Sequence, residues 1–395
     1  MIPFPSRFRA APRVRVLHVY RTYLPDTQGG LEEVIRQICA GSKQFGVESR
    51  ILTLSRSPEP ATIDRPEAKV HRTRTTFELA SCDVSIAAFS AFRELADWAD
   101  IVNYHFPWPF ADVLHLTARH RPRSVVTYHS DIVRQRYLGT LYRPLMKRFL
   151  GSVDRIICTS PNYFATSPVL SAYADKVEVI PIGLDEQTYP KAVPADVAEW
   201  QRRFGRFFLF VGVLRYYKGL HILLDAVKDA PYRVVIAGSG PTEQSLKSQA
   251  ARLGLSNVHF AGRVSDEEKV ALFEASLGVV FPSYLRSEAF GVTLLEGAMH
   301  SRPLISTEVG SGTSHVNIDQ ETGLVVAPGS AKHLREAMDQ LWHRPDVARH
   351  MGNKARKRYE MLFTGNLMGL RYAELYRRVL EGAAEDAGTT TRAAG

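Results

Sequence analysis

The sequence predicts an α/β protein made of two successive doubly wound domains, each with a mostly parallel sheet. Short apolar runs rich in β-branched residues alternate with amphipathic helical stretches along most of the 395 residues. Strands that read as continuous apolar runs are buried on both faces, which is typical of parallel sheets covered by helices. The alternation stops once, at residues 185–205, and then restarts. A chain of this length also exceeds one ordinary hydrophobic core.

The apolar runs place the individual elements. In the first half we expect strands at 14–20, 50–54, 100–105, 124–129, 155–159 and 177–181, with helices such as 31–45 and 84–98 between them. The polar stretch 185–205, with Pro190 and Pro194, reads as a linker. In the second half we expect strands at 207–211, 233–237, 258–261, 278–282, 303–306 and 324–327, and helices at 220–230, 243–253, 266–275, 292–300 and 331–342.

These elements predict four segments. Residues 1–184 form an N-terminal Rossmann-like domain and residues 185–362 a second one. Residues 363–380 form a C-terminal helix that crosses back to the first domain, and residues 381–395 a disordered tail.

Composition and charge narrow the class of protein. Apolar residues make up 45% and charged residues 23% of the chain, as in globular proteins. Residues 1–184 carry 24 Lys and Arg against 17 Asp and Glu, so this half holds most of the formal charge of +9. Such asymmetry indicates a polyanionic or membrane-surface partner. Three cysteines without metal-ligand spacing indicate reduced thiols, and no signal peptide or membrane-spanning run is evident. We therefore expect a cytoplasmic protein.

Ligands of open α/β sheets bind beyond the carboxyl ends of the strands, so the residues after each strand are the candidates. After the first strand, Gly29 and Gly30 precede a helix, where backbone N–H groups and the helix dipole favour an anion. At the start of the second half, Arg215 and Lys218 lie between a strand and a helix. Two cations there would neutralise a diphosphate without a metal. A flexible turn and two solvated charges are the structural alternatives.

The most informative stretch is 287–296, which follows the strand expected at 278–282. A helix begins near Gly291 or Val292, and its first N–H groups suit a phosphate. Glu288 lies just before the helix, whereas Glu296 lies inside it among leucines and alanines. A buried carboxylate requires a hydroxyl or a cation as partner. Two acids at this spacing therefore suit a sugar and a ribose on either side of a diphosphate, although a helix cap and a surface glutamate remain the structural alternative.

Together these motifs resemble the retaining glycosyltransferases of family 4, which have the GT-B fold of two facing Rossmann-like domains with an inter-domain cleft. The resemblance covers about residues 14–380. Further fragments agree in order: Thr-Tyr-His-Ser-Asp at 127–131, Thr-Ser-Pro at 159–161, Ile-Pro-Ile-Gly-Leu-Asp at 180–185, Ala-Gly-Arg-Val at 261–264 and Thr-Gly-Leu-Val at 322–325.

The resemblance implies a role for each matching residue. The N-terminal domain would bind the acceptor, with His129 facing the transferred sugar, and the second domain the nucleotide sugar. Glu288 would accept hydrogen bonds from sugar hydroxyls, and Glu296 from the ribose. The implied catalytic residues are His129, Glu288, Arg215 and Lys218. The implied donor contacts are Gly29, Gly30, Arg215, Lys218, Arg263, Val264, Phe290, Gly291, Val292, Thr293 and Glu296.

One segment departs from the family pattern. Many relatives carry Gly-Gly-x-x-Glu near residue 310, whereas the stretch from Gly310 to His315 lacks the acid, and Glu308 lies too early to replace it. The expected mechanism is a front-face transfer in which the leaving diphosphate accepts the proton of the incoming hydroxyl. No Asp-x-Asp pair follows a strand, so we expect neither a metal nor any other cofactor beyond the nucleotide sugar.

The first half most resembles bacterial mannosyl- and D-rhamnosyltransferases of lipopolysaccharide O-antigen assembly, of the common polysaccharide type. This likeness implies a GDP-linked donor and a lipid-linked acceptor on undecaprenyl diphosphate. Basic residues among apolar ones at helical spacing would lie on an anionic membrane, peripheral to the inner face of the inner membrane. These are Arg134, Arg136, Arg143, Lys147 and Arg148. A helix packed on the sheet with a solvated basic face is the plainer interpretation.

Other functions are weighed against this one. A UDP- or dTDP-linked donor would need the same fold and chemistry. A nicotinamide-dependent oxidoreductase would use the glycines of 237–243, but the third glycine of the dinucleotide fingerprint is missing. The basic residues match no recognised nucleic-acid module, so we expect no nucleic acid. An epimerase or a phosphorylase of the same fold is a further alternative, although no pyridoxal lysine stands out.

Overall fold

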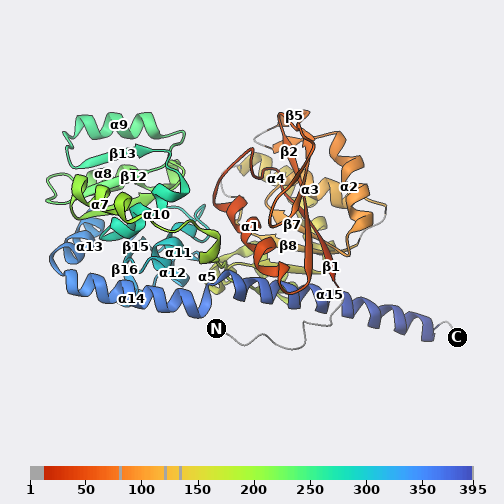
Figure 1. Cartoon of the computed structure of the whole chain (residues 1–395). Coiled ribbons are helices and arrows are strands. Elements are labelled where there is room, and N and C mark those ends of the chain that lie inside the picture. Colours follow the sequence, from red (N-terminus) through yellow and green to blue (C-terminus); the bar gives the residue numbers. More distant parts are fainter. Residues whose placement is uncertain (1–12, 80–81, 120–121, 133–135, 394–395) are drawn as a thin grey trace. The chain divides into compact units, whose positions relative to one another are not determined.

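The computed structural model describes residues 13–79, 82–119, 122–132 and 136–393. The chain separates into two compact units (Figure 1). Unit 1 takes in Met1–Thr159, Ser167–Gly183 and Gly365–Gly395, and unit 2 takes in Ser160–Thr166 and Leu184–Thr364. A short segment of the first half, residues 160–166, therefore belongs to unit 2, which the sequence did not indicate.

The described part of unit 1 is built on an eight-stranded sheet in the order β10-β9-β8-β7-β1-β2-β4-β3. All neighbouring strands are parallel except β3 and β4. The strand order reverses between β1 and β7, which makes this pair the topological switch point. The strands are β1 (Val14–Val19), β2 (Val47–Ser55), β3 (Thr62–Asp64), β4 (Lys69–Arg74), β7 (Ile101–Phe106), β8 (Arg123–Tyr128), β9 (Arg155–Cys158) and β10 (Val177–Val179).

Helices cover this sheet, and a small hairpin lies outside it. The helices of unit 1 are α1 (Gly30–Lys43), α2 (Ala87–Trp98), α3 (Pro109–Thr117), α4 (Arg136–Ser152), α6 (Pro168–Ser171) and α15 (Gly365–Ala393). The hairpin pairs β5 (Phe77–Leu79) with β6 (Cys82–Val84). The apolar interior of β1, β7 and β8 is almost wholly buried, as expected for strands covered on both faces.

The described part of unit 2 holds a wholly parallel six-stranded sheet in the order β13-β12-β11-β14-β15-β16. Its order reverses between β11 and β14. The strands are β11 (Phe207–Val211), β12 (Arg233–Ala237), β13 (Val258–Gly262), β14 (Gly278–Phe281), β15 (Leu304–Thr307) and β16 (Gly323–Val326). Both units are thus doubly wound, and the predicted fold class is confirmed.

The helices of unit 2 follow the strands closely. They are α5 (Pro161–Thr166), α7 (Pro194–Phe204), α8 (Leu220–Ala226), α9 (Glu243–Arg252), α10 (Asp266–Ala275), α11 (Val292–Met299), α12 (Thr313–Val316), α13 (Ala331–His343) and α14 (Pro345–Leu362). The expected linker at 185–205 is wrong in its second part, because α7 forms there and packs against α10. Pro194 begins α7, where a missing N–H costs nothing, so this proline starts a helix.

Helix α15 belongs to unit 1 and crosses α1 (Figure 1). The backbones meet at two glycines: a Cβ placed on Gly369 would lie 2.1 Å from the carbonyl carbon of Gly41. Helix α15 continues to Ala393, beyond the helix expected at 363–380. The disorder expected for 381–395 stays a prediction.

Candidate functional site

The switch point of unit 2 brings together a cation and an acid that the sequence placed 70 residues apart. Lys218 ends the short 3₁₀ helix Tyr216–Lys218 that follows β11, and Glu288 lies in the loop after β14. Lys218 Nζ lies 2.5 Å from Glu288 Oε2, and their side chains are only 13% and 10% exposed. Ser283 donates a second hydrogen bond to the same oxygen, at 3.2 Å. The two predicted residues therefore form one buried, charged centre at the carboxyl edge of the sheet.

Aromatic rings shape the surroundings of this ion pair. Lys218 Nζ lies 4.5 Å from the ring centroid of Phe281 and 5.5 Å from that of Tyr217. Burial and the Glu288 carboxylate raise the pKa of Tyr217, which therefore stays protonated at neutral pH. The low local polarity strengthens electrostatic contacts between Lys218 and any anion that binds beside it.

Helix α11 begins next to this pair and presents unused backbone donors. Gly291 is its N-cap and has φ +90°, a left-handed conformation that side chains rarely adopt. Among the described residues, the N–H groups of residues 290–293 have no protein acceptor. The Thr293 hydroxyl donates a hydrogen bond to the carbonyl of Val211. Four consecutive free donors at a helix start match an anion or several hydroxyl oxygens.

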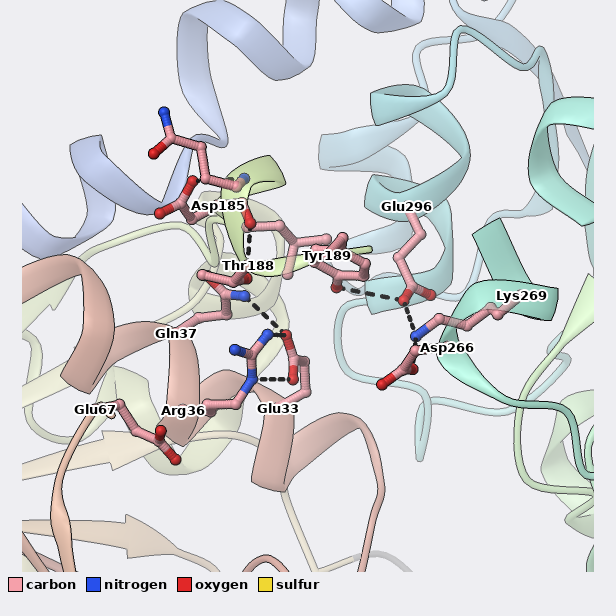
Figure 2. A network of polar contacts seen from close by, with 12 residues as sticks. Glu33, Arg36, Gln37, Glu67, Asp185, Thr188, Tyr189, Asp266, Lys269 and Glu296 are labelled. Atoms are coloured by element: carbon pink, nitrogen blue, oxygen red, sulfur yellow. Dashed lines mark hydrogen bonds and ion pairs between the residues drawn. The ribbon is translucent and has the colours of Figure 1, made fainter. Parts of the chain in front are cut away.

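Glu296, one helical turn further along, is also buried but has different partners. Lys269 Nζ lies 3.0 Å from Glu296 Oε1, and the Tyr189 hydroxyl donates to the same oxygen at 3.3 Å. Lys269 also contacts Asp266 at 3.0 Å. Figure 2 shows these four side chains as one connected set. Burial alone would lower the pKa of Lys269, but the carboxylates of Glu296 and Asp266 outweigh it and raise the pKa above its usual value.

Sequence reasoning missed Lys269 and Tyr189. Lys269 sits on α10 and Tyr189 in the segment that was expected to be a linker. The inference that a buried Glu296 needs a cation or a hydroxyl was sound, but the sequence did not say which residues provide them. Glu296 keeps a second carboxylate oxygen, Oε2, for which the described residues offer no hydrogen-bond partner.

Three further predicted donor contacts lie at the same edge of the sheet. Arg215 follows β11 and is exposed, and the described residues give its guanidinium no ion-pair partner. Arg263 and Val264 follow β13, just before Ser265 caps α10. The glycines of 237–243 have a packing role instead: a Cβ on Gly238 would lie 2.0 Å from the carbonyl oxygen of Gly212. The feature that suggested a dinucleotide site is therefore a close approach between two loops.

His129 lies directly after β8 in unit 1. Its side chain is almost fully buried, and its Nε2 lies 2.9 Å from Nδ1 of His105. Burial lowers the pKa of His129 to about 3, so the ring is neutral at physiological pH. A neutral imidazole can donate one hydrogen bond and accept one, but it adds no charge to the site.

Gly29 and Gly30 lie at the start of α1, as predicted, but acids occupy this helix end. Gly29 is extended, with φ −162°, so its conformation does not require glycine. A Cβ on Gly29 would lie 2.8 Å from Glu32 Oε2, and Thr27 holds that carboxylate through Oε1 at 2.8 Å. Glu33 is bound by Arg36 at 2.7 Å (Figure 2). The sequence argument for a phosphate here overlooked these two carboxylates.

The predicted membrane-facing cations lie on or before α4. Arg143, Lys147 and Arg148 are exposed, and we call them the α4 basic face. Arg134 lies outside the described residues, as does the side chain of Arg136, where the helix begins. Leu141, in the same helix, is 80% exposed.

A buried acid fastens α4 to α3. Tyr142 donates a hydrogen bond to Asp112, and burial raises the pKa of Asp112 well above its usual range. The helix is thus anchored on one side while its basic residues face solvent.

The loop without the family acid has a structural role in unit 2. The carbonyl of Gly310 accepts hydrogen bonds from Thr166 and Arg286, and Arg286 stacks over Tyr163 at 4.4 Å. Glu308 accepts from the N–H of Gly310 at 2.8 Å and from Ser314 at 3.2 Å. The loop therefore holds α5 in unit 2, and Glu308 is occupied within it.

Unit 2 thus collects Lys218, Glu288, Glu296 and the α11 donors at one sheet edge, while His129, Gly29 and the α4 basic face belong to unit 1. No helix in the described ranges combines the length and apolarity needed to span a bilayer. Within those ranges, His, Cys, Asp and Glu form no group of three that could hold a metal ion.

Both halves of the chain match family models of glycosyltransferases. Residues 28–188 match the model "Glycosyltransferase Family 4", and residues 201–358 match "Glycosyl transferases group 1". The chain is 56% identical over 353 residues to the D-rhamnosyltransferase WbpZ of Pseudomonas aeruginosa, covering 89% of this chain and 92% of that protein. It is 49% identical over 369 residues to the O-antigen chain mannosyltransferase C of Escherichia coli, covering 93% and 99%.

Solved structures agree on the fold. Sucrose-phosphate synthase from Thermosynechococcus elongatus superimposes with a TM-score of 0.80 at 20% identity, covering 94% of this chain and 100% of that one. Anabaena HepE in complex with UDP gives a TM-score of 0.73 at 17% identity, covering 92% and 100%. The paired acids, the cations after β11 and these matches lead to one conclusion: the chain is a glycosyltransferase of family 4 with the GT-B fold.

Proposed function

We propose that the chain is a retaining hexosyltransferase of O-antigen assembly, which transfers D-rhamnose or mannose from a GDP-linked donor to a lipid-linked saccharide. The observation that carries this proposal is the edge of the unit 2 sheet, where free N–H groups at 290–293 adjoin Lys218 and the exposed Arg215. These groups suit a diphosphate, with Glu288 and Glu296 placed for hydroxyls on either side.

The relatives support the choice of sugar. The proteins at 56% and 49% identity are a D-rhamnosyltransferase and an O-antigen chain mannosyltransferase. A uridine donor is the second candidate, because the distant HepE structure contains UDP.

In the proposed reaction, a hydroxyl oxygen of the acceptor bonds to the anomeric carbon on the face from which the diphosphate departs. The bond between the anomeric carbon and the phosphate oxygen breaks, and a diphosphate oxygen takes the hydroxyl proton. Lys218, Arg215 and the α11 donors stabilise the negative charge that develops on the leaving group, while Glu288 orients the sugar. Losing one such contact costs about 3 kcal/mol of barrier, roughly a hundredfold in rate.

Arg215 provides the cleanest test of this assignment. Its side chain is exposed and has no ion-pair partner in the described part of the chain, so Arg215→Ala should leave the melting temperature unchanged. Turnover of GDP-D-rhamnose or GDP-mannose should fall roughly a hundredfold. The exposed Arg252→Ala on α9 serves as the control. Near-wild-type turnover in Arg215→Ala would remove the charge-stabilising role.

The nucleotide is identified by thermal shift with GDP, UDP, ADP and dTDP at equal concentration. A ligand present at about a hundred times its dissociation constant stabilises the folded state by about 2.7 kcal/mol, so the preferred base should separate clearly. A larger shift with UDP than with GDP would replace the guanosine donor by the uridine one.

We further propose that transfer needs no metal ion, because protein cations neutralise the diphosphate. Turnover should survive exhaustive treatment with EDTA. Activity that disappears with EDTA and returns with magnesium would contradict this part of the proposal.

We also propose that the protein acts at the cytoplasmic face of the inner membrane, where it would meet an acceptor carried on undecaprenyl diphosphate. The α4 basic face together with the exposed Leu141 supports this placement. Cosedimentation with anionic vesicles, weakened by salt, is the expected behaviour. Absence of binding at low salt would exclude it.

A further inference from the structure

Three buried histidines form a continuous row across the switch point of unit 1, and we call them the histidine chain. His18 lies in β1, His105 in β7, and His129 directly after β8. Nδ1 of His18 lies 3.1 Å from Nε2 of His105, and Nδ1 of His105 lies 2.9 Å from Nε2 of His129. The rings also stack, with centroids 5.4 Å and 5.2 Å apart.

The register of the parallel strands produces this row. His18 pairs with Asn103 and His105 pairs with Thr127, so each histidine lies two residues beyond the position opposite the preceding one. Two-residue steps keep the side chains on one face of the sheet. The row therefore advances toward the carboxyl edge, where His129 ends it.

All three rings are neutral at physiological pH. Burial lowers the pKa of His18 and His129 to about 3, and burial together with its two neighbours holds the pKa of His105 well below its usual range. Each neutral ring carries one proton, so each link needs one donor and one acceptor. Only two arrangements satisfy both links: every ring is protonated on Nδ1, or every ring is protonated on Nε2.

The surroundings of His18, at the inner end of the histidine chain, distinguish these two arrangements. His18 Nε2 is buried and, among the described residues, has no hydrogen-bond partner. Protonation on Nε2 would leave a buried N–H without an acceptor, which folded proteins rarely tolerate. If every ring is protonated on Nδ1, His18 Nε2 is an unprotonated nitrogen and no N–H is left without an acceptor. In this arrangement His129 Nδ1 is an N–H donor at the outer end of the histidine chain.

We propose that His105 is a positioning residue for His129: its Nδ1–H donates to His129 Nε2 and so presents His129 Nδ1–H toward the carboxyl edge of the sheet. There His129 donates a hydrogen bond to an oxygen of the substrate bound at that edge. Which bound molecule carries that oxygen rests on the proposed function, whereas the arrangement of the three protons does not.

Nitrogen NMR of the ¹⁵N-histidine-labelled protein tests the proton arrangement directly, with signals assigned from single substitutions at the three positions. We expect all three rings to be neutral and protonated on Nδ1 at neutral pH. A proton on Nε2 of His129, or a charged ring in the chain at that pH, would overturn the proposal.

Two substitutions test the positioning role. His105→Phe retains a stacked ring but removes both hydrogen bonds, and it should lower kcat roughly ten- to a hundredfold with little change in the KM for the donor. His105→Asn retains an amide donor near the position of Nδ1 and should recover most of kcat. His71→Gln is the control, because His71 is a partly buried histidine of unit 1 whose Nε2 is likewise unpartnered among the described residues.

The outcomes separate this inference from the proposed function. Wild-type kcat in His105→Phe, with the His129 protons unchanged, would refute the positioning role. If the wild-type protein transferred no sugar from a GDP-linked donor, the proposed function would fail. The NMR signals would still decide the arrangement of the histidine chain.

Discussion

Replacing Lys218 by methionine should both destabilise unit 2 and slow sugar transfer, and a second substitution should repair only the first defect. The side chains of Lys218 and Glu288 are 13% and 10% exposed, with their charged atoms 2.5 Å apart. In Lys218→Met the Glu288 carboxylate keeps, among the residues that the structure describes, only the hydroxyl of Ser283 as a partner. Within that part of the chain, Glu288 would then be a buried charge without a counter-ion.

The size of each loss follows from this geometry. Removing one partner of a buried ion pair costs about 3–5 kcal/mol, and the retained serine places this case near 3 kcal/mol. In a unit of this size, that corresponds to a fall in melting temperature of roughly 6–12 °C. Loss of a cation at the proposed diphosphate site should separately lower turnover roughly a hundredfold.

The double variant Lys218→Met with Glu288→Gln distinguishes the two roles. Its pair is uncharged, so thermal unfolding should recover most of the lost stability, while turnover should stay at least as low as in Lys218→Met. Lys247→Met is the control, because Lys247 pairs with Glu243 at the surface of α9 and is worth about 1 kcal/mol at most. Equal destabilisation in the single and double variants, or restored turnover in the double variant, would refute the reasoning.

Three other predictions follow from the packing and charge of unit 1. Gly369→Ala should destabilise the protein by about 2 kcal/mol in urea unfolding, because its Cβ would overlap the α1 backbone. Gly382→Ala in the same helix has open space and should not destabilise the protein. Folding lowers the pKa values of the three histidines, so the unfolded protein binds more protons than the folded one below pH 6.5. The free energy of unfolding should therefore fall by about 2 kcal/mol per ring between pH 7 and pH 5. Replacing one of the rings by phenylalanine should make this pH dependence shallower. Replacing the three residues of the α4 basic face by glutamates should weaken cosedimentation with anionic vesicles more than a hundredfold, because each cation removed costs about 1 kcal/mol of binding free energy. The same change at three exposed cations of unit 2 is the control and should have little effect.

The apolar strands were predictable, but the polar edge of the first sheet was not. Runs such as Phe207–Val211 are buried at every position, and their composition reveals them. Strand β4, Lys69–Arg74, consists mostly of charged and polar residues and lies near an edge, so its sequence lacks an apolar run. The β5–β6 hairpin, outside the main sheet, gave no signal for the same reason.

The candidate site was predictable where its residues are consecutive in sequence. Glu288, Gly291 and Glu296 share one short stretch, and the helix start among them follows from local rules. Lys269 and Tyr189 reach Glu296 from two other segments, so only the folded sheet brings them together. The histidine chain likewise depends on strand register, which the strand sequences alone did not supply.

Because α5 is held by the Gly310 loop, the boundary between the two units is not a single point in the sequence. The chain passes from one unit to the other at residues 159/160, 166/167, 183/184 and 364/365. A hybrid enzyme made by one cut near residue 184 would keep α5 from one parent and its loop from the other, and would pair α15 with a foreign α1. Successful recombination between relatives should therefore carry residues 160–166 along with unit 2, and return to the original parent before residue 365.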